Sequence, residues 1–266
     1  MFKLHLTAAA LLTVVLSAPG AFAVPFTFSV DSAVSGVDLT LVGLSGPTPI
    51  TQPITETIPL SGSITLDVDV SGGTVQSVDF LSLDLLYVVD VANPVVFEAN
   101  LIPQGIPFEI RLPFDPALAS GNPITPLDPR LTLDAASAGL EAGTGGGLTL
   151  ADPGFGFEAT GQLFGSPLAP DGFPFNLGPY PLQDTFPGAP PDPNALDGAV
   201  TLVGNQLVFD ATFLSIGLGG VGLVQAGQVH DGSLTATAVV PEPSTALLLG
   251  LGLATLSRAR RTAPVI

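Results

Sequence analysis

The side chains best suited to acid–base or nucleophilic chemistry are scarce in the body of this chain, residues 24–240. That segment contains one histidine, His230, and neither lysine nor cysteine. A catalytic histidine needs a serine and an acid that the fold brings to it, and no motif for a nucleophile elbow, a phosphate-binding loop or a zinc-binding helix is present. We therefore predict no catalytic residues and no enzymatic activity, and we expect His230-Asp231-Gly232 to form a turn before the last strand.

Asp67 and Asp69 are the candidate metal ligands of the sequence. In the alternating run 62–70 they share one strand face, so their charges repel each other unless water or a cation screens them. Calcium takes six to eight oxygen ligands and extracellular calcium sites are often weak. The further ligands of an EF-hand loop are missing, so we expect no cofactor and no cofactor-binding residues, with calcium at Asp67 and Asp69 as the alternative.

Paired carboxylates also hydrolyse glycosides. Sugar-binding sites commonly provide flat aromatic platforms, whereas this chain has no tryptophan and only two tyrosines, Tyr87 and Tyr180. A secreted glycosidase is therefore the less favoured interpretation of the acidic residues.

The charge of the chain excludes a nucleic-acid-binding role. The formal net charge is −17, and between residues 24 and 240 there are 22 acidic side chains against only Arg111 and Arg130. Such a body repels phosphate backbones. The acids are dispersed rather than clustered, which is typical of a solvated surface that keeps an apolar protein soluble.

The first 23 residues have the three parts of a secretory signal peptide. Lys3 provides the positive start, Leu6 to Leu16 form an apolar run too short to span a bilayer stably, and the small-residue site Ala21-Phe22-Ala23 follows. We predict a signal helix that is cleaved after Ala23, with the secretion translocon and signal peptidase as partners.

The C-terminal residues 240–261 form a second predicted targeting signal. The order is an extended Val240–Thr245 segment containing Pro241, Glu242 and Pro243, a short apolar run over 246–257, and a basic end. The basic end comprises Arg258, Arg260 and Arg261. Arginines hold a helix end in the cytoplasm, so we predict a short transmembrane helix with residues 24–239 outside.

This tail resembles the PEP-CTERM sorting signal. In that family an exosortase, an integral membrane enzyme similar to transpeptidases, processes the tail, and the hosts are chiefly Gram-negative bacteria that make extracellular polysaccharide and biofilm. The resemblance implies an exosortase-type partner, transient anchoring in the inner membrane, and delivery to the cell surface or extracellular matrix, with exopolysaccharide as a further partner. It covers only residues 240–261 and implies nothing about the body.

The body has the pattern of an antiparallel all-β protein. Apolar and polar residues alternate in successive short runs bounded by turn-forming residues. Ser71-Gly72-Gly73 and Gly204-Asn205 each separate two such runs, which predicts two hairpins. Strands are expected near 24–31, 36–44, 62–70, 74–91, 199–203, 206–213 and 232–240. The predicted fold is a β-sandwich or a partly open barrel.

Two stretches, 101–147 and 164–197, are rich in proline and glycine, and we predict long loops there because each proline removes a ladder donor. The second contains phenylalanines that favour packing on the sandwich over free motion. A boundary between two domains there is the alternative to one domain with large loops. At most a single helical turn is expected, over residues 116–120.

Three classes of function remain open on the sequence alone. The first is an exported, non-catalytic surface or matrix protein. The second is a secreted module that binds calcium, glycan or an apolar molecule held by the loop containing phenylalanines, and the third is a secreted hydrolase. The first follows from the two terminal signals and from the missing catalytic residues.

Overall fold

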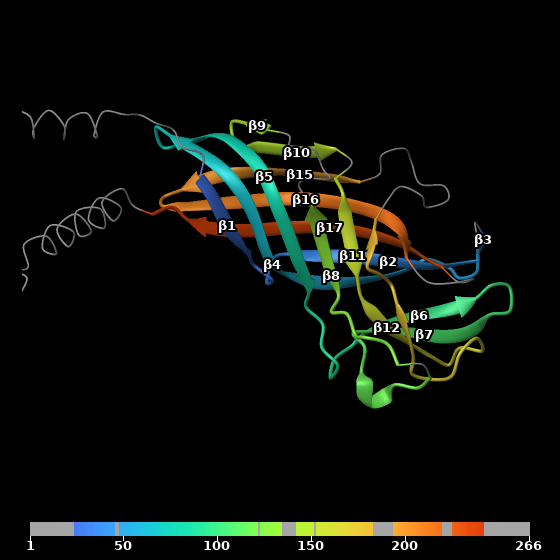
Figure 1. Cartoon of the computed structure of the whole chain (residues 1–266). Helices are drawn as coiled ribbons and strands as arrows, with labels where there is room; N and C mark the ends of the chain where they lie inside the picture. The colour runs from blue at the N-terminus through green and yellow to red at the C-terminus, as the bar shows by residue number, and fades with distance from the viewer. Residues whose placement is uncertain are drawn as a thin grey trace, which may run out of the picture.

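The computed structural model describes residues 24–45, 48–121, 123–134, 142–151, 153–182, 194–219 and 225–241. These residues form antiparallel sheets, as predicted (Figure 1). The one short helix among them, a 3₁₀ turn over Pro116–Leu118, confirms the single turn expected there. The predicted signal helix and the predicted C-terminal transmembrane helix lie outside the described residues. Within those ranges, no helix is both long and apolar enough to cross a membrane.

Thirteen strands of the described residues belong to one large sheet. They are β1 (Val24–Val30), β2 (Gly36–Ser45), β3 (Thr48–Pro49), β4 (Ile54–Ser71), β5 (Thr74–Tyr87), β8 (Arg130–Asp134), β9 (Ala142–Thr144), β10 (Gly147–Ala151), β11 (Phe155–Glu158), β14 (Tyr180–Pro181), β15 (Ala195–Val203), β16 (Gln206–Gly219) and β17 (Gln225–Val239). Its main order is β10-β15-β16-β17-β1-β4-β5-β8-β11-β14.

Two strands that are consecutive in sequence, β1 and β2, lie in the middle of this sheet. Strands β1 and β2 follow one another along the same line between β17 and β4, with only the turn 31–35 between them. In that turn the Asp31 carboxylate accepts a hydrogen bond from the Ala33 amide at 3.0 Å, which is the local bond that aspartate offers a turn. The turn 31–35 therefore interrupts the strand but leaves β2 running in the same direction as β1.

Both predicted hairpins are present. Gly72 and Gly73 link β4 to β5 with φ of 61° and 79°, the left-handed backbone that tight hairpin turns require. Gly204 and Asn205 link β15 to β16. Both strands of each pair were expected, but β4, β16 and β17 are longer than the alternating segments indicated.

The large sheet curls so that its β10 end approaches β5. In the turn between β9 and β10, the Gly145 amide donates to the Gln76 carbonyl of β5, and the Gly146 carbonyl accepts from Val200 of β15. The same curling brings β11 and β16 face to face, with the rings of Phe155 and Phe213 at 6.1 Å. The described residues therefore form an all-β structure of antiparallel sheets, as the sequence predicted.

Inward-facing side chains fill the space between the two layers. Leu207, Phe209, Ala211 and Phe213 of β16 are all buried, which confirms the face predicted from their alternation. Leu66 and Val68 of β4 are buried in the same core. Burying each such side chain contributes about 1.5–3 kcal/mol, so these alternating strands supply most of the driving force for folding.

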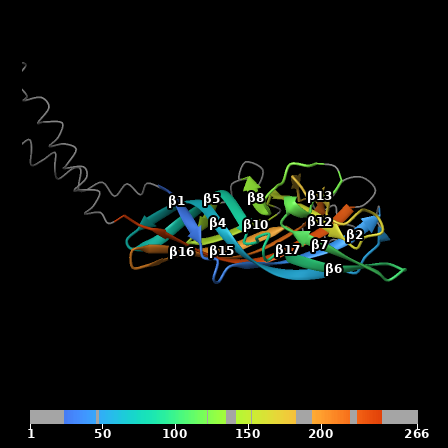
Figure 2. The same ribbon diagram turned by 90° about the horizontal axis from the view of Figure 1, so that it is seen from below.

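A second, four-stranded sheet lies at one end of the elongated body (Figure 2). Its order is β13 (Phe173–Asn176), β12 (Thr160–Phe164), β7 (Ile106–Leu112) and β6 (Val95–Leu101). The two stretches predicted as long loops, 101–147 and 164–197, also contain short strands: β7, β8 and β9 lie in the first, and β13 and β14 lie in the second. Phe175 packs against the core, as predicted for this segment.

Candidate functional site

The two segments predicted as export signals adjoin the same end of the body. Strand β1 starts at Val24, and β17 ends at Val239. The antiparallel pairing of Val30 with Ala236 and of Ser29 with Thr237 puts the start of β1 and the end of β17 at the same end of the sheet, at the left of Figure 1. Ala21 and Ala23 of the predicted cleavage site lie outside the described residues.

Val240 and Pro241 are the last described residues and follow β17 directly. The Val240 amide donates to the Asn205 carbonyl at 2.8 Å, and the next residue, Pro241, is exposed and has no amide hydrogen to continue the ladder. The other predicted tail residues lie outside the described part of the chain: Glu242, Pro243, Arg258, Arg260 and Arg261.

His230 lies inside a strand and not in a turn, so that prediction was wrong. It is in the interior of β17, is fully buried, and pairs with Ser215 of β16 and Leu39 of β2. Gly232 is not a turn residue either. A Cβ there would lie 2.2 Å from the Phe213 ring. The glycine is needed because that ring occupies the space beside it.

A chain of buried hydrogen bonds fixes the protonation of His230. The Gln228 amide nitrogen donates to the Leu177 carbonyl, which turns the Gln228 amide oxygen toward His230 Nε2 at 3.2 Å. Because that oxygen only accepts, Nε2 carries the proton, and Nδ1 accepts from the Tyr87 hydroxyl at 2.6 Å. Every polar atom of the imidazole is thus engaged within the protein.

Burial also determines the charge of this pair. Desolvation lowers the pKa of His230 to about 3, and it raises the pKa of Tyr87 well above its ordinary value. The Phe157 ring, 4.6 Å from the imidazole, adds an apolar neighbour. Both groups are therefore neutral at physiological pH, and the arrangement is that of a satisfied polar network in a core.

Asp67 and Asp69 lie on the same face of β4, as the alternating pattern predicted. The register sets Asp79 of β5 directly opposite Asp67, a third carboxylate that the sequence reasoning did not associate with them. One carboxylate oxygen of Asp67 and one of Asp69 are buried without a hydrogen-bond partner. Among the described residues, no group of three or more histidine, cysteine or acidic side chains is arranged to hold a metal ion.

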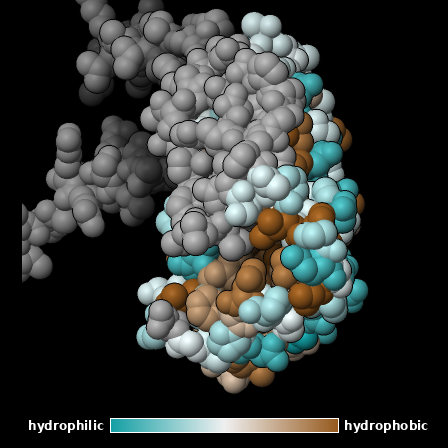
Figure 3. Space-filling model, turned by 90° about the vertical axis from the view of Figure 1, so that its right-hand side faces the viewer, coloured by the Kyte–Doolittle hydropathy of each residue, from teal (hydrophilic) through white to brown (hydrophobic). Residues whose placement is uncertain are grey.

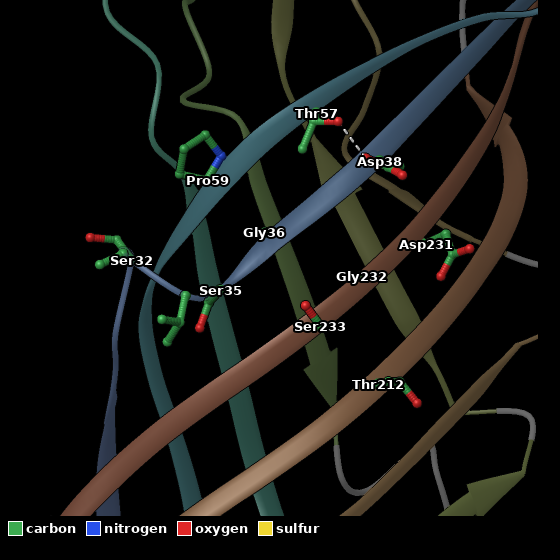
Figure 4. Close-up of a pocket in the computed structure, with 12 residues that line it drawn as sticks. Ser32, Ser35, Gly36, Asp38, Thr57, Pro59, Thr212, Asp231, Gly232 and Ser233 are labelled. Carbon is green, nitrogen blue, oxygen red and sulfur yellow. Dashed lines mark hydrogen bonds between the residues drawn. The ribbon is translucent and has the colours of Figure 1, made fainter.

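A shallow polar hollow lies on the outer face of β2 and β17 (Figure 4). Its volume is about 520 Å³, and its two acids, Asp38 and Asp231, stand directly opposite each other in the strand register. The Thr57 hydroxyl donates to the Asp38 carboxylate at 2.6 Å. We name this surface the polar hollow. No sequence signal joins two aspartates that lie so far apart in the chain.

An apolar cavity of about 460 Å³ lies between the ends of β2 and β17, the four-stranded sheet and the loop after β12. Its walls include Leu41 and Val42 of β2, Phe173 and Phe175 of β13, and Ala226 of β17. Figure 3 shows apolar side chains gathered in a hollow on the right-hand side of the body. The sequence signals were the unbroken apolar run at residues 41–42 and the phenylalanines of the second proline-rich stretch.

Comparison with known families identifies the tail and not the body. Residues 239–261 match the model of the PEP-CTERM protein-sorting motif. The prediction made from the tail residues is thereby confirmed: the chain carries this motif, which indicates an exported protein that an exosortase-type membrane enzyme processes. No curated protein and no solved structure matches the chain.

Proposed function

We propose that this protein is a non-catalytic component of the cell surface or extracellular matrix of a Gram-negative bacterium. In this proposal the tail anchors it transiently in the inner membrane, and an exosortase then releases it into a matrix that contains exopolysaccharide. The observation that carries the proposal is the sorting motif at residues 239–261.

The geometry of the chain ends supports the proposed anchoring. Because β1 starts and β17 ends at the same end of the sheet, the predicted signal peptide and the sorting tail both adjoin that end of the body. The exposed Pro241 directly follows the hydrogen bond from the Val240 amide to the Asn205 carbonyl and has no amide hydrogen with which to continue the ladder. A membrane enzyme that acts beyond this point does not need to unfold the sheet.

The outer strand faces support a role outside the cell. Asp38, Asp84, Asp197, Asp210 and Asp231 are exposed on strands whose opposite faces are buried. Like charges dispersed over these faces keep the body soluble. This suits a protein that persists at high local concentration in a matrix.

The state of His230 supports the absence of catalysis. It is the only histidine between residues 24 and 240, and both of its ring nitrogens are committed to buried partners. It cannot take a proton from a serine while it holds these bonds. We expect the purified exported protein to hydrolyse neither simple esters nor simple glycosides, and turnover of either would contradict this part of the proposal.

The sorting step is tested by replacing Pro241, Glu242 and Pro243 together with alanine in the producing cell. The parent should be released without Arg258, Arg260 and Arg261, while the variant should be exported but retained in the membrane with these arginines. Intact-mass spectrometry of the released and membrane fractions distinguishes the two forms.

The matched control replaces two exposed loop prolines, Pro123 and Pro126, with alanine. This control should mature like the parent, because it leaves the tail unchanged. Release and maturation of the tail variant at the parental level would show that the tail is only an anchor. Co-fractionation of the released parent with exopolysaccharide, lost on digestion of the polymer, tests the proposed matrix partner.

A further inference from the structure

We propose that the apolar cavity binds an uncharged, largely apolar small molecule, such as an alkyl chain that ends in a hydroxyl or ester group. This goes beyond the proposed function, because neither export nor sorting requires a ligand. The cavity is formed by parts of the chain that are far apart in sequence.

The walls of the cavity are built from both sheets. Leu41 and Val42 of β2 are 1% and 7% exposed, and Phe108 of the four-stranded sheet is buried opposite them. Phe173 and Phe175 supply two aromatic rings. Aliphatic and aromatic walls of this kind are typical of small-molecule sites, which enclose roughly 300–1,000 Å³. The volume of about 460 Å³ lies within that range.

The polar groups of the lining exclude a charged ligand. No charged side chain lines the cavity within the described residues. The Thr51 hydroxyl accepts from the Gly43 amide, the Asn176 amide oxygen accepts from Thr160, and the Ser166 hydroxyl accepts from the Leu168 amide. A charged group would lose its hydration here without gaining an ionic partner, which is strongly unfavourable.

Water is also an unfavourable occupant of the cavity. A buried water molecule needs two to four polar partners, and most of this lining is hydrocarbon. The net charge of −17 further disfavours anionic amphiphiles such as fatty-acid carboxylates. An uncharged apolar molecule meets neither obstacle.

The cavity lies at the end of the body remote from the sorting tail. Val239 is thirteen positions after Ala226, a wall residue, along β17, which is about 40 Å at the rise of an extended strand. Leu168 on its rim is 60% exposed. A ligand can therefore enter from the side opposite the membrane while the protein is still anchored.

Binding is tested with the exported protein in the form that cells release, using the uncharged fluorescent probe N-phenyl-1-naphthylamine. We expect saturable binding at one site, displacement by 1-dodecanol, and much weaker displacement by dodecanoate at neutral pH. Ala169→Phe and Ala226→Phe place a ring inside the cavity from a loop and from a strand, and each should weaken probe binding by about tenfold or more because the ring takes up the ligand's space.

The control variant is Ala33→Phe, in the exposed turn beside the polar hollow. It adds the same ring at a distant site and should bind the probe like the parent. Circular dichroism of each variant establishes that it is folded, and the loop variant Ala169→Phe remains informative if Ala226→Phe misfolds.

Three results would overturn the proposal. One is the absence of saturable probe binding, and another is equal binding by the parent and both filled variants, which would place the probe elsewhere. The third is a released protein that sediments as a dimer and binds the probe only when dissociated, which would show that a second copy covers the cavity.

Discussion

The polar hollow and the apolar cavity are built on the same two strands, yet their surfaces are opposite in character. Along β2 the polar hollow uses Asp38, and the cavity begins only three residues later at Leu41. Along β17 the hollow uses Asp231 and the cavity uses Ala226. The two surfaces differ first in the strand face that they use. Period-two alternation puts Leu41 and Ala226 on the buried face of these strands, whereas Asp38 and Asp231 lie on the exposed face.

The burial pattern of β2 shows this directly. Asp38 is exposed between buried Val37 and Leu39, which is the alternation of a sheet with one face in water. From Leu41 onward the alternation stops, and Val42 is buried although it points to the outer side. Val42 lines the apolar cavity together with residues of the four-stranded sheet, among them Phe108 and Phe173. A break in alternation therefore marks where a second layer begins.

The largest expected effect comes from a charge on the covered face. Val42→Asp should lower the free energy of unfolding by about 3–5 kcal/mol, because it buries an ion without a partner. Thr40→Asp, on the uncovered part of the same strand, should cost about 1 kcal/mol or less. Urea denaturation of the exported protein measures both. Similar losses in the two variants would show that the outer face of β2 is equally covered at both positions.

The buried hydrogen-bond network of Tyr87, His230 and Gln228 should be destabilised by the loss of a single hydroxyl. Tyr87→Phe leaves Nδ1 of His230 buried and unpaired, and we expect it to lower the free energy of unfolding by about 1–3 kcal/mol. Thr57→Val removes a hydroxyl from the exposed polar hollow and should cost much less. Thermal or urea unfolding compares the two, and a larger loss for Thr57→Val would contradict the assignment of the buried network.

Acid should weaken the fold through His230. Its pKa is about 3 in the folded protein and about 6.5 in the unfolded chain, so between these values the unfolded chain binds a proton that the native protein does not. The stability contribution is present above pH 6.5 and is lost as pH falls, by about 2 kcal/mol between pH 6.5 and 4.5. The comparison is unfolding of the parent and of His230→Gln at each pH. An equal slope in both would assign the effect to other groups.

The smallest expected change in stability comes from removing one charge in the polar hollow. Asp38 and Asp231 are directly opposite, and like charges in that position destabilise an antiparallel pair. Asp231→Asn should raise the free energy of unfolding by about 0.2–1 kcal/mol at low ionic strength, with the gain shrinking as salt is added. A loss of stability, or a gain that salt does not change, would indicate that the two carboxylates do not repel each other.

Much of the fold was accessible from the local pattern. Period-two alternation is a property of neighbouring residues, so the strands around residues 24–30, 36–45 and 206–213 and the two glycine turns could be predicted. The prolines predicted loops where the structure also has short strands. Whether a proline excludes a strand depends on whether a neighbouring strand needs its missing amide hydrogen. Pro107 lies in β7 beyond the part that pairs with β12, and Pro174 lies in the edge strand β13, so neither removes a bond that a second neighbour requires.

The sequence by itself determined the terminal sorting signal and the all-β character of the body, because both depend on residues that are adjacent or closely spaced along the chain. Only the tertiary structure decided the surroundings of His230, the opposition of Asp38 to Asp231, and the apolar cavity. Each of these depends on pairings between segments more than a hundred residues apart. Such pairings are set by how the curled sheet closes over its core, and no local spacing in the sequence encodes that closure.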